Sequence, residues 1–236
     1  MSRDELIVFE DVEVRRGGFR LNVPRWSVRA GGVIGVVGAN GAGKTTLLRL
    51  LPGLDPVDGG SIRVFGHDPW QEPVEVRTQL GFMTDDMPVF ALRLAELLRF
   101  VSGYYPSWDA GLVDELIRRF ELDLSKHAAV LSKGEATRLR LVLAMAIRPR
   151  VLVLDEPATG LDLMGRRTLL ETVLEFVQDP QRTVIVSSHA IADVERIADQ
   201  LLVLKGGEVL QDGPTDELVG EGRSLEEAFL QWNEAS

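Results

Sequence analysis

The first part of the chain alternates between apolar and polar positions. Residues 6 to 14 (LIVFEDVEV) mostly do so and residues 21 to 28 do so loosely, which is typical of half-buried strands. We expect these two segments to form antiparallel strands. Residues 33 to 37 are a short apolar run with β-branched side chains, which predicts a strand buried on both faces. A glycine-rich turn ends that run, and a helix is predicted at residues 45 to 51.

The middle of the chain has a helical pattern after two short predicted strands, at residues 61 to 66 and 80 to 83. A turn-rich SGYYPSWD separates two predicted helices, at residues 92 to 101 and 111 to 120. We interpret the chain as a single domain, residues 1 to 236. An inserted helical subdomain is expected at approximately 86 to 135.

After residue 131, helical and strand patterns alternate. This alternation predicts a mostly parallel sheet with helices on both faces, and thus an α/β fold with an antiparallel N-terminal β subdomain. The tail is predicted to be a short amphipathic helix at residues 224 to 232. The other predicted elements are helices at 136–147, 165–177 and 190–198 and strands at 151–154, 183–187 and 200–204.

Charge and composition restrict the possible partners. The net charge is −10 and the isoelectric point near 4.9, which argues against nucleic acid, because phosphate backbones are bound by clustered Lys and Arg. The absence of cysteine fits a cytosolic protein without disulfides or zinc. No apolar run approaches the roughly 18 residues of a membrane-spanning helix, and the start has no signal-peptide layout. We therefore expect any membrane to be spanned by another chain.

A phosphate-binding loop is predicted at GANGAGKT, residues 38 to 45, which fits G-x-x-x-x-G-K-[ST] between a buried strand and a helix. Backbone N–H groups and the helix start would attract the β- and γ-phosphates of a nucleotide. Lys44 would bridge those phosphates, and the Thr45 hydroxyl would bind Mg²⁺. The candidate nucleotide-binding residues here are Gly38, Asn40, Gly41, Ala42, Gly43, Lys44, Thr45 and Thr46.

Two adjacent carboxylates end the predicted strand in VLVLDEP, residues 151 to 157. Asp155 would hold Mg²⁺ through its water shell, and Glu156 could polarise an attacking water. The alternative is a strand that ends in a solvated acidic turn without a function. A phosphate-binding loop upstream makes this alternative less favoured.

Three further motifs occur in a recognisable order. LSKGE, residues 131 to 135, lies twenty residues before the Asp-Glu pair, and TGLD, residues 159 to 162, follows it. His189 lies after a later predicted strand. Together with the phosphate loop, this set resembles the ATP-binding cassette (ABC) family, whose signature motif is usually LSGGQ, and the resemblance covers essentially the whole chain.

The resemblance implies a head-to-tail dimer that sandwiches two ATP molecules. Ser132 and Gly134 would then contact the γ-phosphate of the ATP held by the partner. Asp162 would line the dimer seam, and His189 would sense the γ-phosphate in its own subunit. Glu156 and His189 are thus the implied catalytic residues.

Three places depart from the family pattern. Lys133 stands for one glycine of the usual signature pair, and Glu135 for its glutamine. Asp85, in LGFMTDD, stands where the family carries the Q-loop glutamine, and is a third candidate metal ligand. The aromatic residue that stacks on adenine is also missing at its usual place; either Arg15 or Arg16 could stack there, or Phe19 could serve.

The resemblance further implies an ATPase with ATP and Mg²⁺, at the cytoplasmic face of the membrane and bound to a separate transmembrane permease subunit. The second cassette would be an identical or a different ABC subunit. Export is favoured because SLEEAFL, residues 224 to 230, resembles the end of bacterial exporter ATPases. The alternatives are a soluble ABC ATPase without transport, and a non-catalytic regulatory cassette. The single acidic cassette argues against the former, and Glu156 with His189 argues against the latter.

Overall fold

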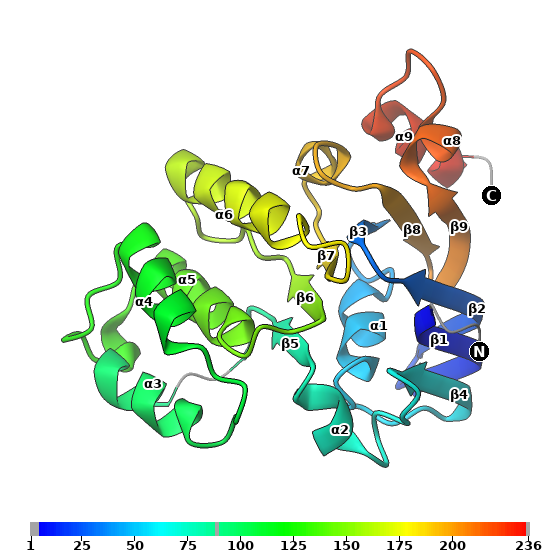
Figure 1. Ribbon diagram of the computed structural model, residues 1–236. Helices are drawn as coiled ribbons and strands as arrows, with labels where there is room; N and C mark the ends of the chain where they lie inside the picture. Colours follow the sequence, from blue (N-terminus) through cyan, green and yellow to red (C-terminus); the bar gives the residue numbers. More distant parts are fainter. Residues whose placement is uncertain (1–4, 88–89, 235–236) are drawn as a thin grey trace.

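A nine-stranded mixed sheet with helices on both faces organises the part of the chain described by the computed structural model, residues 5–87 and 90–234 (Figure 1). The strand order is β4-β1-β2-β9-β8-β3-β7-β6-β5. The strands are β1 (Glu5–Arg16), β2 (Phe19–Arg29), β3 (Gly32–Gly38), β4 (Gly59–Val64), β5 (Leu80–Met83), β6 (Val151–Asp155), β7 (Thr183–Ser187), β8 (Gln200–Lys205) and β9 (Glu208–Pro214).

The helices differ in length and position along the chain. They are α1 (Lys44–Leu50), α2 (Pro73–Arg77), α3 (Leu94–Ser102), α4 (Ala110–Arg119), α5 (Lys133–Met145), α6 (Leu163–Phe176), α7 (Ile191–Glu195), α8 (Thr215–Val219) and α9 (Leu225–Glu234). Within the described ranges, no helix has the length and apolar character needed to cross a membrane.

The strands β8, β3, β7, β6 and β5 pair in parallel. In β6, Val151 and Val153 pack in the same apolar core as α1, whereas Leu152 and Leu154 pack in the core of α4, α5 and α6. A strand with two buried faces needs a continuous apolar run, and this is the pattern that predicted it. The predicted α/β fold class is confirmed.

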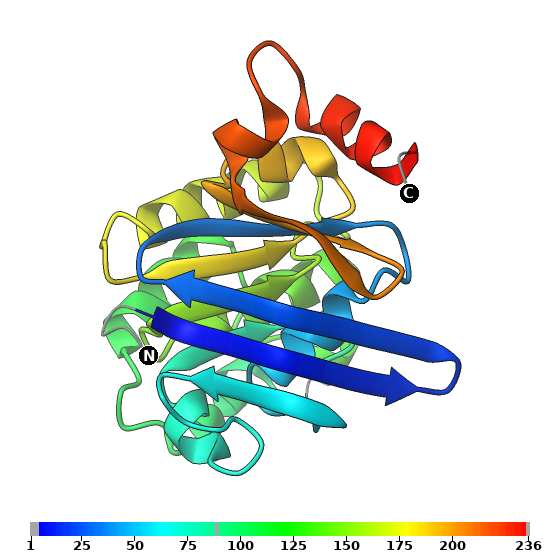
Figure 2. The same cartoon turned by 90° about the vertical axis from the view of Figure 1, so that its right-hand side faces the viewer.

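The N-terminal strands form an antiparallel layer over α1 (Figure 2). A two-residue turn that contains Gly17, with φ of +57°, joins β1 to β2. Phe9 and Trp26 lie opposite each other in these strands, with ring centroids 5.2 Å apart, and both are buried. The predicted pair of antiparallel strands is confirmed.

The helices α3, α4 and α5 lie together beside β5, away from the antiparallel layer (Figure 1). They share a core with Met83 at the end of β5. The proposed limits of the helical subdomain, about 86 to 135, stay a prediction, and residues 88 and 89 within them lie outside the described residues.

Several element boundaries differ from the sequence-based prediction. The helices α5 and α6 begin at Lys133 and Leu163, earlier than predicted, because Ser132 and Asp162 are their N-caps. The helix α7 ends at Glu195, short of the predicted residue 198. The prediction missed β9, α2 and α8. The strand β9 is mostly half-exposed and polar, so it has no apolar run.

Candidate functional site

The loop between β3 and α1 borders a cavity of about 460 Å³. Gly41 and Gly43 have φ of +79° and +106°, a left-handed conformation that favours glycine. Gly43 is the N-cap of α1 and provides no capping side chain, so the first N–H groups of the helix are not occupied by one. The cavity is lined by Phe19, Asn40, Gly41, Ala42, Gly43, Lys44, Thr45, Thr46 and Glu156.

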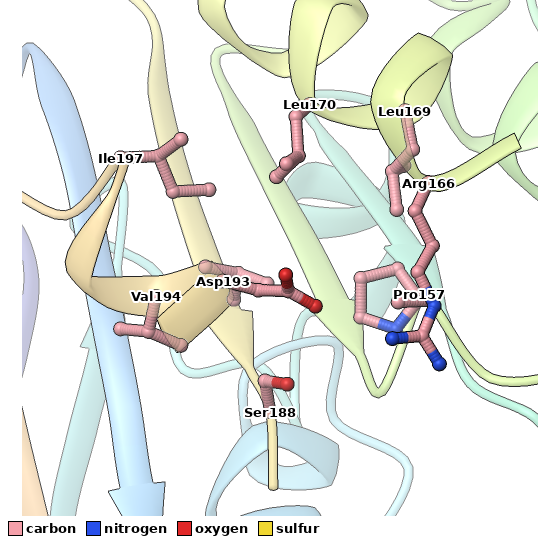
Figure 3. A pocket seen from close by; sticks show the side chains of 10 residues that line it. Pro157, Arg166, Leu169, Leu170, Ser188, Asp193, Val194 and Ile197 are labelled. Carbon is pink, nitrogen blue, oxygen red and sulfur yellow. The ribbon is translucent and has the colours of Figure 1, made fainter. Parts of the chain in front are cut away.

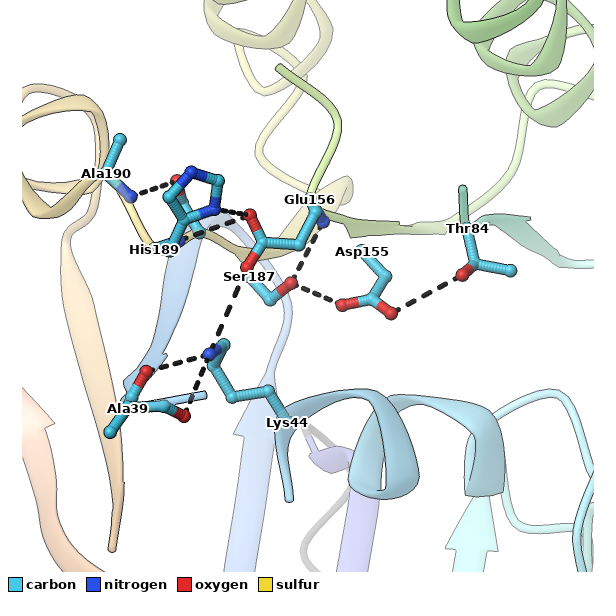
Figure 4. A network of polar contacts seen from close by, with 10 residues as sticks. Ala39, Lys44, Thr84, Asp155, Glu156, Ser187, His189 and Ala190 are labelled. Atoms are coloured by element: carbon cyan, nitrogen blue, oxygen red, sulfur yellow. Dashed lines mark hydrogen bonds and ion pairs between the residues drawn. The ribbon is translucent and has the colours of Figure 1, made fainter. Parts of the chain in front are cut away.

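Lys44 is buried at the start of α1, with 7% of its surface exposed. Its Nζ donates a hydrogen bond to the Gly38 carbonyl at 2.7 Å and lies 4.0 Å from Glu156 Oε1 (Figure 4). Gly38 approaches β8 so closely that a Cβ there would be 2.5 Å from the Leu204 carbonyl oxygen. The glycine therefore sets the path of the loop that surrounds the amine.

Asp155 is the last residue of β6, and its carboxylate is buried. The parallel register places it beside Ser187 of β7, whose hydroxyl donates to Asp155 Oδ1 at 2.5 Å. On its other side, the Thr84 hydroxyl lies 3.5 Å from Asp155 Oδ2. The hydrogen bond from Ser187, at the end of the neighbouring strand, thus orients this carboxylate (Figure 4).

Glu156 has φ of +52°, a left-handed conformation that is costly for a residue with a side chain. Its N–H donates to the Ser187 hydroxyl at 3.0 Å. The carboxylate oxygen Oε2 accepts from the His189 N–H at 3.2 Å and contacts His189 Nδ1 at 2.6 Å. Because an ionised carboxylate can only accept, we assign the ring proton to Nδ1.

A second cavity, of about 440 Å³, adjoins the first and shares Asn40, Thr45 and Glu156 with it. Its lining oxygens come from carboxyl and hydroxyl groups, the donors that Mg²⁺ prefers. The described residues form no group of three or more metal-binding His, Cys, Asp or Glu. Mg²⁺ needs only one or two carboxylates beside waters and substrate phosphates, so Thr45 and Asp155 fit this ion. The complete lining is Asn40, Thr45, Thr84, Asp85, Asp86, Asp155, Glu156, Thr159 and His189.

Asp85 also lines this second cavity, but its carboxylate is engaged in ion pairs. Its Oδ2 lies 3.0 Å from Lys133 Nζ, and its Oδ1 lies 3.7 Å from Arg140 Nη1. Its neighbour Asp86 accepts from the Thr84 hydroxyl at 2.9 Å and lies 3.5 Å from Arg49 Nη1. The assignment of Asp85 as a metal ligand stays a prediction.

The signature segment begins α5. Ser132 is the N-cap: its hydroxyl accepts from the Glu135 N–H at 3.2 Å, and its own N–H donates to Glu135 Oε2 at 2.9 Å. This reciprocal pair is a capping box. Gly134 is buried, and a Cβ there would lie 2.9 Å from the Gly160 carbonyl oxygen.

Asp162 caps α6, with its Oδ1 accepting from the Gly165 N–H at 2.7 Å. In the part of the chain that the structure describes, Ser132, Gly134 and Asp162 line neither cavity. The predicted site residues therefore form two groups: the phosphate loop with the acid pair and His189, and the signature with Asp162.

Phe19 is the adenine-stacking candidate that borders the first cavity. Its ring packs on the phosphate loop, since a Cβ on Gly43 would lie 2.9 Å from Phe19 Cζ. Arg15 instead pairs with Glu13, and Arg16 with Asp58. Of the three alternatives, Phe19 has the position that suits stacking.

A third cavity lies between α6 and α7, and its lining includes Pro157 and Ser188, the sequence neighbours of Glu156 and His189 (Figure 3). The Asp193 carboxylate points into it, and its Oδ2 has no hydrogen-bond partner in the described chain. The space is about 20 Å³, far below the roughly 300 Å³ at which ligand pockets begin. This cavity is therefore not a candidate nucleotide site.

Ser187 and Thr84 were missed by the sequence analysis. Each carries a hydroxyl at the end of a strand that neighbours β6, and each lies beside Asp155. The signal was present in the pattern: in a parallel sheet, predicted strands end at the same edge, so polar residues that follow them meet there.

The capping box gives a first testable prediction. The hydrogen bond from Lys126, followed by those from Ser132, lowers the pKa of Glu135 to about 2. Because the folded pKa is depressed, the stabilisation is present above the unfolded pKa of 4.5 and lost as the pH falls toward 2. We expect Glu135→Ala to lower the free energy of unfolding by about 1 to 2 kcal/mol at pH 7, and by less at pH 3.

Glu135→Gln is the matched control, because glutamine keeps the cap but loses the ion pair with Lys126. It should cost less than about 1 kcal/mol. Urea unfolding at the two pH values measures both variants. Equal losses for alanine and glutamine at pH 7 would contradict the role of the cap.

The geometry of the site is that of a P-loop nucleotide-binding protein with an acid pair beside the phosphate loop. Residues 21–159 match the ABC transporter family, which is more than half of the chain. The chain belongs to the ABC transporter family, as one of its ATP-binding subunits. The identification from the sequence motifs is thus confirmed.

The similar proteins in this family include a resistance protein and an import protein. The chain is 30% identical over 204 residues to the ABC transporter ATP-binding protein YtrB of Bacillus subtilis, covering 86% of this chain and 70% of YtrB. It is 33% identical to the daunorubicin/doxorubicin resistance ATP-binding protein DrrA of Streptomyces peucetius, covering 85% of this chain and 61% of DrrA. It is also 33% identical to the molybdenum import ATP-binding protein ModC of Albidiferax ferrireducens, covering 92% of this chain and 61% of ModC.

Solved structures have the same fold. A structure described as the ATP-binding subunit of an ABC transporter superposes with a TM-score of 0.86 and 25% identity, over 97% of this chain and 99% of the other. A second, cbiO1 from Clostridium perfringens, part of the complex cbiONQ, superposes with a TM-score of 0.75 at 24% identity, over 98% of this chain and 96% of the other.

Proposed function

We propose that this chain hydrolyses ATP and thereby powers transport through a separate membrane subunit. The observation that supports hydrolysis best is the position of Glu156. Its carboxylate lies 4.0 Å from the Lys44 amine and 2.6 Å from His189 Nδ1, on the boundary between the two cavities. A base that borders both the phosphate loop and the acidic cavity can act on water beside a terminal phosphate.

The chemical steps follow from these positions. Lys44 and the loop N–H groups bind the β- and γ-phosphates of ATP. Thr45 and Asp155 would hold Mg²⁺, which would neutralise the charge that develops on the phosphates. Glu156 orients water and accepts its proton as the water oxygen attacks the γ-phosphorus, and the bond to the β-phosphate oxygen breaks to release ADP. His189 orients the carboxylate through its Nδ1 hydrogen bond.

A second cassette completes the site in this proposal. Ser132 and Gly134 line neither cavity of their own chain, as expected if they act on ATP held by a partner. Two large apolar side chains directly after Asp162 are exposed, Leu163 at 82% and Met164 at 65%. Burying them against a second cassette would be favourable, because apolar surface contributes about 25 cal/mol per Å² removed from water.

The membrane subunit would dock on an apolar groove beside the loop that follows β5. The groove has a volume of about 410 Å³, and its lining includes Phe82, Met87 and Phe90. Phe90 continues into a row of exposed aromatic rings, with Phe100 5.8 Å away and Tyr104 5.3 Å beyond. Exposed apolar patches of this kind mark protein interfaces. The occupant we propose is a cytoplasmic segment of the membrane subunit.

Export is the direction we propose, on the resemblance of the C-terminal SLEEAFL to the corresponding segment of exporter ATPases. All of these residues but Ser224 lie in α9, where Leu225 is buried against α7 and α8. In vesicles that carry the complex with this chain outside, an exporter would accumulate cargo in the lumen on addition of ATP. Depletion of cargo from the lumen would contradict export.

The test of the proposed function is phosphate release by the purified full chain and by its complex with the co-purifying membrane subunit. We expect Mg²⁺-dependent release of one phosphate per ATP, at a higher rate in the complex. Saturable ATP binding without phosphate release in either preparation would support the regulatory cassette instead.

A further inference from the structure

Two departures from the family pattern contact each other in the structure. By the resemblance of the motifs, Lys133 stands for a signature glycine and Asp85 for the Q-loop glutamine, and the Lys133 Nζ lies 3.0 Å from Asp85 Oδ2. They are 48 positions apart in the sequence and belong to different motifs. A glycine and a glutamine could not make this ion pair, so the contact depends on both substitutions.

The ion pair is part of a polar stripe on one face of α5. Lys133, Thr137 and Arg140 are spaced i, i+4 and i+7, which places them on the same side of a helix. Arg140 lies 3.7 Å from the Asp85 carboxylate and donates to the Met87 carbonyl at 3.1 Å. The contacts of Lys133 and Arg140 thus hold α5 against the loop after β5.

The same stripe also contacts the loop after β6. The Thr137 hydroxyl donates to the Thr159 carbonyl at 3.2 Å. The stem of Lys133 packs on Gly160, where a Cβ would be 2.7 Å from Lys133 Cγ. Thr159 and Asp85 both line the acidic cavity. Lys133 is therefore in contact with both loops that connect this cavity to α5.

We propose that Asp85 and Lys133 are a matched positioning pair, which holds the signature end of α5 in register with the acid pair of its own chain. The inference rests on the proposed ATP hydrolysis and names two positioning residues for it. Neither side chain would touch the reacting atoms. Their role is to set where Ser132 and Gly134 lie relative to Asp155 and Glu156, and small displacements of such groups reduce turnover.

The test is a double-mutant cycle on the full chain, alone or in its complex with the membrane subunit. It uses Asp85→Asn, Lys133→Gln and the double variant. We expect each single change to lower kcat about three- to tenfold with less than a twofold change in KM for ATP. The double variant should lose no more than the worse single variant, because both changes break one interaction.

The dependence of kcat on ionic strength distinguishes a lost ion pair from a general loss of stability. Both side chains are about half exposed, so salt should screen their attraction. The ratio of wild-type kcat to variant kcat should therefore fall about twofold when the salt concentration rises from roughly 0.05 to 0.5 M. As a control, Glu175→Gln removes the 2.6 Å pair with Arg119 between α4 and α6, away from both cavities, and should leave kcat unchanged.

Three outcomes would overturn the proposal. Additive losses in the double variant would mean that the two residues act independently. A rise in the Mg²⁺ concentration for half-maximal activity in Asp85→Asn, without one in Lys133→Gln, would make Asp85 a metal ligand instead. A wild-type chain and complex without ATPase activity would refute the proposed function, and the positioning role with it. Melting temperatures of all variants show whether they are folded.

Discussion

Replacing Lys44 with alanine is expected to abolish ATP hydrolysis and to weaken ATP binding about ten- to hundredfold. The physical reason is the loss of charge-assisted hydrogen bonds to the β- and γ-phosphates, which contribute about 1.5 to 3 kcal/mol. The Lys44 side chain is buried, and its amine donates to the Gly38 carbonyl and lies 4.0 Å from Glu156, so the charge is held at the phosphate loop. Equilibrium dialysis with ATP and a phosphate-release assay measure the two effects.

Arg167→Gln is a suitable control for Lys44→Ala. It removes a cation from an exposed i,i+4 pair with Glu171 on α6, so it makes the net charge one unit more negative, as Lys44→Ala does, without touching either cavity. Wild-type turnover in Lys44→Ala would refute the assignment of the phosphate loop. A melting temperature within a few degrees of wild type would show that the variant is folded.

Replacing Glu156 with glutamine is expected to retain ATP binding and to lower kcat by about two to four orders of magnitude, the range that general-base catalysis contributes. The amide keeps the size of the side chain but cannot accept a proton from water. Because ATP would bind without being consumed, dimers should accumulate in Mg·ATP, and size-exclusion chromatography would detect them.

Glu171→Gln is the matched control for Glu156→Gln, since it makes the same chemical change on the exposed face of α6. Turnover at the wild-type rate in Glu156→Gln would rule out the catalytic assignment. A variant that binds ATP and stays monomeric would show that the isolated chain does not dimerise in the proposed way.

Much of the fold was predictable because the spacing of apolar residues along the chain indicates which positions are buried. Residues 151 to 154 are apolar throughout and β6 is buried on both faces, whereas residues 6 to 14 mostly alternate and β1 has both buried and exposed positions. The polar strand β9 carries no such signal. It forms by backbone pairing with β8, which side-chain pattern does not specify.

The candidate site was predictable where its residues are adjacent in the sequence. The phosphate loop and the acid pair are continuous motifs, and the structure places them on adjoining cavities. Contacts between distant segments were not predictable in the same way. The pair of Asp85 with Lys133 depends on how α5 lies against the loop after β5, and nothing in either segment alone reveals it.

At position 156, thermal stability and the proposed turnover of ATP favour different residues. Glycine, and to a lesser extent asparagine, adopts a φ of +52° more readily than glutamate, so either would relieve a conformation that costs on the order of 1 kcal/mol. Neither would supply the base that the proposed hydrolysis requires at this position. A library of variants ranked by melting temperature alone would therefore enrich inactive chains at this position. Any programme that engineers a more heat-resistant form of this cassette has to keep residue 156 fixed and seek its gains elsewhere.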